Sequence, residues 1–106
     1  GPMPGGMGGG MMSQIKKLQE QMETAQASLE VETVTATVGG GAVKVTMTGA
    51  QVCKGIEIDP DLLKDGDAEM LQDLILSGVN MALDQSRKLA EERMGPLAGG
   101  LSGLGF

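Results

Sequence analysis

Apolar residues recur in the first third of the chain at alternating steps of four and three positions. The series is Met11, Ile15, Leu18, Met22, Ala25 and Leu29. This spacing is the a/d pattern of a helix with one narrow apolar seam, and Ser13 is a suitable N-cap. The pattern predicts a helix from Ser13 to about Leu29 that packs against a single neighbouring helix.

The hydrophobic period then changes from helical spacing to alternation. Residues 30–38 are rich in β-branched side chains, residues 43–48 alternate strictly between apolar and polar, and residues 52–58 form a third such segment. Gly55 is a candidate for a β-bulge, and the glycine run at 39–41 can turn the chain between strands. The pattern predicts a three-stranded antiparallel meander.

A second long helix is predicted from Asp67 to about Met94. Between Met70 and Leu83 its apolar side chains cover an arc of roughly 240° at 100° per residue. One small sheet cannot cover so wide an arc, so we expect part of it to face a second subunit. The residues assigned to this dimer interface are Leu71, Leu74, Ile75, Leu76, Val79 and Leu83.

These elements predict an α+β protein with the order α-β-β-β-α. The chain has 106 residues, enough for one domain, which we place at residues 13–94. Residues 1–12 are expected to form a flexible Gly/Met-rich tail, in which residues 1–2 resemble the scar of a cleaved tag. Residues 95–106 are expected to form a flexible Gly/Leu-rich tail. So small a domain buries only about 60% of its unfolded surface, which also favours a partner subunit.

The composition offers little catalytic chemistry. The chain has no His and a single Cys, Cys53, which we expect to be a buried small hydrophobic residue. The carboxylates between Asp59 and Asp67 lack the closing Glu of a calcium loop. We therefore predict no enzyme activity, no metal and no cofactor. The nine Met residues are interpreted mainly as core residues.

No segment has the length of a membrane span and no signal peptide is evident, which predicts a soluble intracellular protein without a membrane partner.

The formal net charge of −6 alone argues against a nucleic-acid partner. The charges are unevenly distributed, however. Short connections make the two long helices antiparallel, so the start of the first and the end of the last should lie together, away from the sheet. Five of the eight basic residues fall there: Lys16, Lys17, Arg87, Lys88 and Arg93. From the residues alone, a solvated helix face remains the favoured interpretation.

The segment from Gly39 to Leu63 carries a more specific pattern. It reads Gly-x-Gly-x-Val-Lys-Val, then Gly49, Cys53, Ile58-Asp59-Pro60 and Leu62-Leu63. This pattern resembles the YbaB/EbfC family of small bacterial nucleoid-associated proteins, and the resemblance extends from about Met11 to Met94. It implies a cytoplasmic, nucleoid-associated, tweezer-like intertwined homodimer that contacts double-stranded DNA with its two long helices. By position, it assigns DNA binding to the five basic residues named above.

The resulting hypothesis is a non-enzymatic architectural protein that binds double-stranded DNA with little sequence specificity and has no small-molecule substrate. The alternative is a protein-interaction or assembly module that docks through Met-rich helices. The two differ in salt dependence, because phosphate contacts weaken steeply with added salt.

Overall fold

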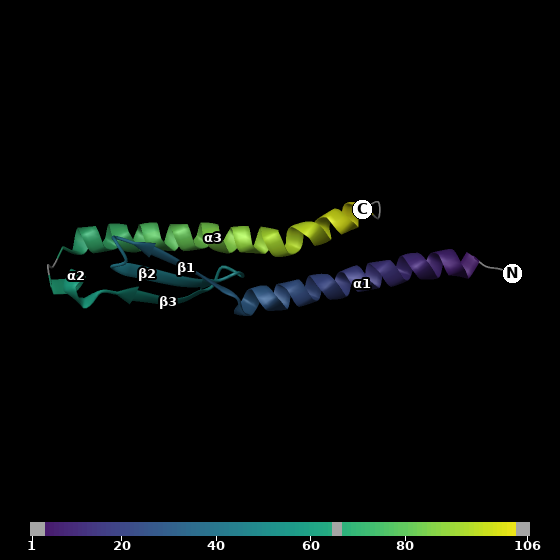
Figure 1. Cartoon of the computed structure of the whole chain (residues 1–106), viewed down its shortest axis with the longest axis horizontal. Coiled ribbons are helices and arrows are strands. Elements are labelled where there is room, and N and C mark those ends of the chain that lie inside the picture. The colour runs from purple at the N-terminus through teal and green to yellow at the C-terminus, as the bar shows by residue number, and fades with distance from the viewer. Residues whose placement is uncertain (1–3, 65–66, 104–106) are drawn as a thin grey trace.

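The computed structural model describes residues 4–64 and 67–103 of the chain. The elements, in order, are α1 (Pro4–Val31), β1 (Thr33–Val38), β2 (Val43–Thr48), β3 (Cys53–Ile58), α2 (Pro60–Lys64) and α3 (Ala68–Gly103). The strands form one antiparallel sheet in the order β1-β2-β3. In Figure 1, the first part of α3 lies along this sheet, and α1 extends away from its end. The predicted α+β class and meander are confirmed.

Glycine residues form the turn between β1 and β2 and lie beside the bulge of the sheet. Gly39, Gly40 and Gly41 connect β1 to β2 with φ angles of 63°, 67° and 93°, which residues with a Cβ adopt only at a cost. Between β2 and β3, Thr46 pairs with Gly55 while Met47 pairs with Cys53. Lys54 is thus the additional residue of a β-bulge, directly beside the glycine that the sequence marked as a candidate.

The core is a close contact between α3 and the first two strands. Val43 and Val45 of β2 are fully buried. Three small residues of α3, spaced four positions apart, lie against β2 or its end: Gly78, Ala82 and Ser86. The hydroxyl of Ser86 donates a hydrogen bond of 2.6 Å to the carbonyl oxygen of Thr48, at the end of β2. Small side chains at this spacing let the helix axis approach the sheet closely.

α3 covers β1 and β2 but leaves β3 largely open. Ile56 is the direct partner of Val45 and therefore lies on the same face of the sheet, yet Ile56 is 42% exposed whereas Val45 is 0% exposed. Cys53, also on β3, is exposed. The prediction that Cys53 is buried is wrong for this chain, because the helix does not reach over its strand.

The methionines also differ from their interpretation as core residues. Met47 is buried in the sheet, but four others are exposed: Met11, Met12, Met70 and Met81. This chain supplies no second layer that covers them, and Met11 is exposed although it belongs to the apolar seam of α1.

Both long helices extend beyond the predicted ends. α1 begins at Pro4, not at Ser13, and α3 ends at Gly103, not at Met94. Proline suits a first helical position because it has no N–H to satisfy there. Pro96 lies inside α3, where proline removes one hydrogen bond and kinks a helix, and Figure 1 shows the last part of α3 bending. Half-buried Leu97 continues the apolar face past the proline. The predicted flexibility of the chain ends remains a prediction, and the suggested tag scar at residues 1–2 lies outside the described residues.

The close approach of α3 to the sheet predicts the effect of enlarging Gly78. A Cβ at this position would lie 2.9 Å from Cγ2 of Val45, a stiff, fully buried side chain that cannot move aside. Overpacking of this kind costs about 1–3 kcal/mol, which outweighs the gain of about 1 kcal/mol in helix propensity on replacing Gly by Ala. We expect Gly78→Ala to lower the free energy of unfolding in a denaturant titration at fixed protein concentration.

Gly99 provides the matched control, because it lies in the same helix, does not precede a proline, and a Cβ there would meet nothing within 4 Å. Gly99→Ala should raise the free energy of unfolding by up to about 1 kcal/mol. Equal effects of the two substitutions would contradict the proposed close contact.

Candidate nucleic-acid interface

Beyond the sheet, α3 runs beside the part of α1 nearer the sheet, and α1 extends past the end of α3 (Figure 1). We define residues 4–29 of α1 and 87–103 of α3 as the helical arm. The two helices are antiparallel, and the chain measures 81 × 19 × 16 Å along its principal axes. The apolar seam predicted for α1 is visible in its burial: Leu18 and Leu29 are buried and three further seam residues are half-buried, namely Ile15, Met22 and Ala25. From Ile15 onward the seam packs on a neighbouring helix, as its spacing predicted, whereas its first residue, Met11, is exposed.

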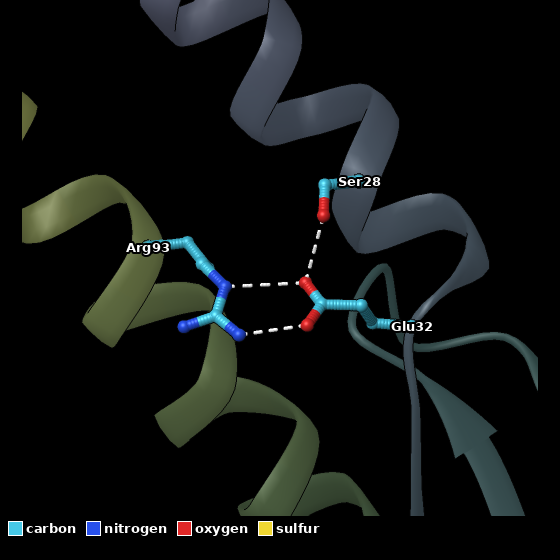
Figure 2. A network of polar contacts seen from close by, with 3 residues as sticks. All are labelled: Ser28, Glu32 and Arg93. Carbon is cyan, nitrogen blue, oxygen red and sulfur yellow. Dashed lines mark hydrogen bonds and ion pairs between the residues drawn. The ribbon is translucent and has the colours of Figure 1, made fainter.

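Glu32 occupies the root of the arm, between the end of α1 and the start of β1. Figure 2 shows its carboxylate between α1 and α3. Oε1 accepts a hydrogen bond of 2.7 Å from Nη2 of Arg93, and Oε2 accepts one of 3.1 Å from Nε of the same guanidinium and one of 2.8 Å from the hydroxyl of Ser28. The Arg93 pair is bidentate, the arrangement that fixes orientation best.

The main chain of Glu32 is held as firmly as its side chain. Its N–H donates to the carbonyl oxygen of Ser28 at 2.9 Å, and its carbonyl oxygen accepts from the N–H of Gly49 at 3.0 Å. Glu32 therefore links α1, the turn between β2 and β3, and α3.

An apolar contact lies next to this polar one. Gly49 is buried, and a Cβ at this position would lie 2.5 Å from Cδ2 of Leu29 and 3.2 Å from Cδ2 of Leu89. The turn thus fits between the last part of α1 and α3 only because it carries no side chain there. The sequence marked Gly49 as a turn residue, but no sequence pattern indicated that two helices close on it.

The ion pair shifts the titration of both partners. Hydrogen bonds from Arg93 and then from Ser28 hold the pKa of Glu32 below its ordinary value near 4.5. The hydrogen bond with Glu32 raises the pKa of Arg93, so the guanidinium remains charged throughout the accessible pH range. The side chains of Arg93 and Glu32 are 44% and 33% exposed, respectively.

The five candidate DNA-binding residues do not gather at the far end of the arm as predicted. Ser86 is anchored on the end of β2, so Arg87 and Lys88 follow at the root of the arm, and Arg93 is held at the root by Glu32. Lys17 lies 15 residues before Glu32 along α1, about 22 Å away at 1.5 Å per residue. The prediction placed all five together because it ended α3 at Met94, whereas the helix continues to Gly103.

The candidates also face different directions. Lys17 and Arg93 line one groove between the helices, together with Glu20, Gln21, Thr24, Ala25 and Ser28. Lys16 lines a separate hollow on α1 with Met12, Ser13, Ile15 and Gln19. On α3, Lys88 lies about 140° around the helix axis from Arg93, given 100° per residue. Lys16, Lys17, Arg87 and Lys88 are exposed, and among them only Arg87 forms an ion pair within the described residues, with Asp84 at 3.6 Å.

The residues predicted for the dimer interface divide into two groups. Leu76 is 62% exposed. The other five pack in part against the core of their own chain: Leu71, Leu74, Ile75, Val79 and Leu83. Sequence periodicity placed all six on one apolar arc, but it could not tell which part of that arc the chain's own sheet would cover.

Metal ligation and membrane crossing would each require a specific arrangement of side chains. Among the side chains that the structure describes, no group of three or more Cys, Asp or Glu residues is arranged to hold a metal ion. Within residues 4–64 and 67–103, the apolar stretches of the helices fall short of what a membrane crossing requires.

Comparisons with known proteins agree with the pattern in the sequence. The model of the YbaB/EbfC DNA-binding family matches residues 3–101. A nucleoid-associated protein of Ruminiclostridium cellulolyticum is 48% identical over 103 residues, which cover 94% of this chain and 90% of that protein. A nucleoid-associated protein of Chloroflexus aurantiacus is 44% identical, and the match covers 89% of this chain and 94% of that protein. The crystal structure of an uncharacterised protein from Helicobacter pylori has a similar fold, with a TM-score of 0.59 and 24% identity, covering 82% of this chain and 96% of that one.

The lowered pKa of Glu32 predicts how this contact responds to pH. A carboxylate whose pKa is lower in the folded state adds stability above its unfolded pKa and loses that contribution as pH falls through the folded value. Glu32→Gln should therefore lower the melting temperature at pH 7. The difference from the parent protein should shrink as the pH falls below about 4.5. A difference that grows on acidification would contradict the assignment.

Proposed function

The chain belongs to the YbaB/EbfC DNA-binding family, whose members are nucleoid-associated proteins rather than enzymes, and we propose that it binds double-stranded DNA in the nucleoid as a homodimer with little sequence specificity. Phosphate contact is assigned to four exposed residues of the helical arm or its root: Lys16, Lys17, Arg87 and Lys88. The remaining candidate, Arg93, is engaged by Glu32.

The observation that carries this proposal is the separation of charge along the molecule. The basic residues of the arm extend from its root to the outer part of α1, whereas exposed carboxylates surround the opposite end of the sheet: Glu57, Asp59, Asp61, Asp67, Glu69 and Asp73. The two basic side chains nearest this end are paired locally, Lys44 with Glu57 at 3.9 Å and Lys64 with Asp61 at 3.3 Å. A phosphate backbone would therefore be repelled from the sheet end and accepted only along the arm.

The composition supports a backbone contact over base readout. The sequence contains one aromatic residue, Phe106, so it lacks the rings on which single-stranded bases stack. Lys and Arg side chains on two helices can contact the regularly spaced phosphates of a duplex. Such contacts position a protein on DNA without specifying the sequence.

The proposed homodimer follows from the apolar surface that one chain leaves uncovered. Six large apolar side chains of α2, β3, α3 and the residue before β3 are exposed: Val52, Ile56, Leu63, Met70, Leu76 and Met81. A symmetric dimer would bury the same patch of both copies against each other, and a domain of this size gains stability from that burial. Two arms would then be held by one body.

The rival function is a protein-interaction module, which the exposure of Met11 at 53% and Met12 at 66% on α1 favours. Exposed methionines form adaptable apolar surfaces. Apolar docking depends little on salt, whereas phosphate contact depends on it steeply, so one titration separates the two.

We expect Lys16→Gln/Lys17→Gln to weaken binding to several duplexes of unrelated sequence by a similar factor. The slope of log affinity against log salt concentration should fall by about 0.9 for each phosphate that the variant no longer neutralises. Fluorescence anisotropy at two or more salt concentrations measures both quantities.

The matched control is Lys44→Gln/Lys64→Gln, which removes the same two charges from the other end of the molecule. It should leave both affinity and slope nearly unchanged. A larger effect of the control than of the Lys16/Lys17 variant would place the duplex across the sheet, against the proposal.

Leu76→Asp tests the homodimer. A carboxylate buried at the subunit interface would weaken association by about 3 kcal/mol or more, roughly a hundredfold, with the fold of each chain retained because Leu76 lies outside its own core. Sedimentation velocity should show monomer at concentrations where the parent protein is a dimer. Val31→Asp is the control, since Val31 is 76% exposed on the last turn of α1, away from the proposed interface. An unchanged dimer in the Leu76→Asp protein would refute this interface.

A further inference from the structure

We propose that Arg93 acts in DNA binding as a positioning residue: with Glu32 it forms a strut that fixes the angle between α1 and α3, and it does not contact phosphate itself. This inference rests on the proposed function and refines it. It separates Arg93 from the other four basic residues predicted to bind DNA. It also gives a role in DNA binding to an acidic residue, Glu32.

The geometry of the pair is that of a link between segments. Arg93 is on α3, and Glu32 is fixed through its own main chain to Ser28 of α1 and to Gly49 of the turn between β2 and β3. The guanidinium uses its Nε and Nη2 edge for the carboxylate, in the planar bidentate form that fixes relative orientation. Figure 2 shows that this pair spans the space between the two helices.

A surface ion pair adds only modestly to global stability, so we assign the effect of this pair on DNA binding to geometry. Lys17 lies about 22 Å from Glu32 along α1, at 1.5 Å per residue. A change of about 10° in the direction of α1 at its root would therefore displace Lys17 by about 4 Å, comparable to the rise of one base pair, about 3.4 Å. Fixing the root of the arm thus fixes the spacing between the phosphate contacts of α1 and those of α3.

The direction of Arg93 also separates it from Lys88, the proposed phosphate ligand nearest to it on α3. It faces the groove toward α1, whereas Lys88 lies on the far side of α3. Its charge is neutralised by Glu32 at 2.7 Å. A phosphate at this position would have to approach a carboxylate, which costs electrostatic energy.

Two interpretations of Arg93 predict opposite effects of Glu32→Gln. If Arg93 were a phosphate ligand, removing the competing carboxylate would strengthen DNA binding. If the pair is a strut, Glu32→Gln should weaken binding, roughly two- to tenfold, although it makes the protein less negative. Glu20→Gln is the charge-matched control, because Glu20 lines the same groove and the structure records no ion pair for it within the described residues. Its removal should leave binding unchanged or slightly stronger.

A double-mutant cycle with Arg93→Gln completes the test. We expect Glu32→Gln, Arg93→Gln and the double variant to weaken duplex binding by similar factors, because each breaks the same strut. Arg93→Gln should leave the salt slope unchanged, whereas removal of a phosphate ligand would lower it by about 0.9. Arg93→Lys, which keeps the charge but not the bidentate geometry, should resemble Arg93→Gln. Circular dichroism should show parental helix content for every variant.

Three results would overturn the inference: stronger binding by Glu32→Gln, a salt slope lowered by Arg93→Gln, or parental affinity of Arg93→Lys. Measuring Lys16→Gln/Lys17→Gln in parallel separates this inference from the proposed function. If that variant binds weakly while Glu32→Gln binds more strongly than the parent protein, only the strut is refuted. A parent protein that binds no duplex refutes both.

Discussion

The close contact between α3 and the first two strands determines where everything else in this chain lies. Gly78, Ala82 and Ser86 present almost no side-chain volume toward β2, so the helix axis lies near the sheet. The hydrogen bond from Ser86 to the Thr48 carbonyl then fixes the helix along its own axis. A larger residue at any of these positions would lift α3 and shift every residue beyond it, including those of the helical arm.

The same contact explains why β3 is left uncovered and why α3 meets α1 and the turn at Gly49 at the root of the arm. A single helix centred on β1 and β2 cannot also cover β3, which leaves Ile56 exposed and creates the apolar surface that we assign to a second copy. At the other end, α3 leaves the sheet in a direction that brings Leu89 against Gly49 and Arg93 against Glu32. The proposed interface and the arm are thus two consequences of one helix placement.

Much of the fold was predictable from local sequence, because its signals are periodicities and turn residues. The seam of α1, the three strands, the glycine turn at 39–41 and the bulge near Gly55 all follow from such signals. The helix ends were not predictable in this way, since proline and glycine act as stop signals only where no neighbour supports continuation. At Pro96, Leu97 continues the apolar face and the helix persists. The exposure of Cys53 was mispredicted because alternation identifies a strand face but not what covers it.

The candidate site was less predictable from the sequence than the fold, because its contacts join residues that are far apart in the chain. Charge counting identified the basic residues, yet it could not show that Arg93 is matched to Glu32, 61 positions away in the sequence. It also overstated the objection raised by a net charge of −6. At physiological ionic strength the Debye length is about 8 Å, so the carboxylates at the far end of the sheet are screened from phosphates held along the arm. The carboxylates that remain relevant are those of the arm itself: Glu20, Glu23, Glu91 and Glu92. In the proposed complex they would reduce the attraction of the arm for DNA, so a single contact would contribute little. Binding would then depend on several modest contacts at a fixed spacing, and for that a rigid root would matter more than an additional positive charge.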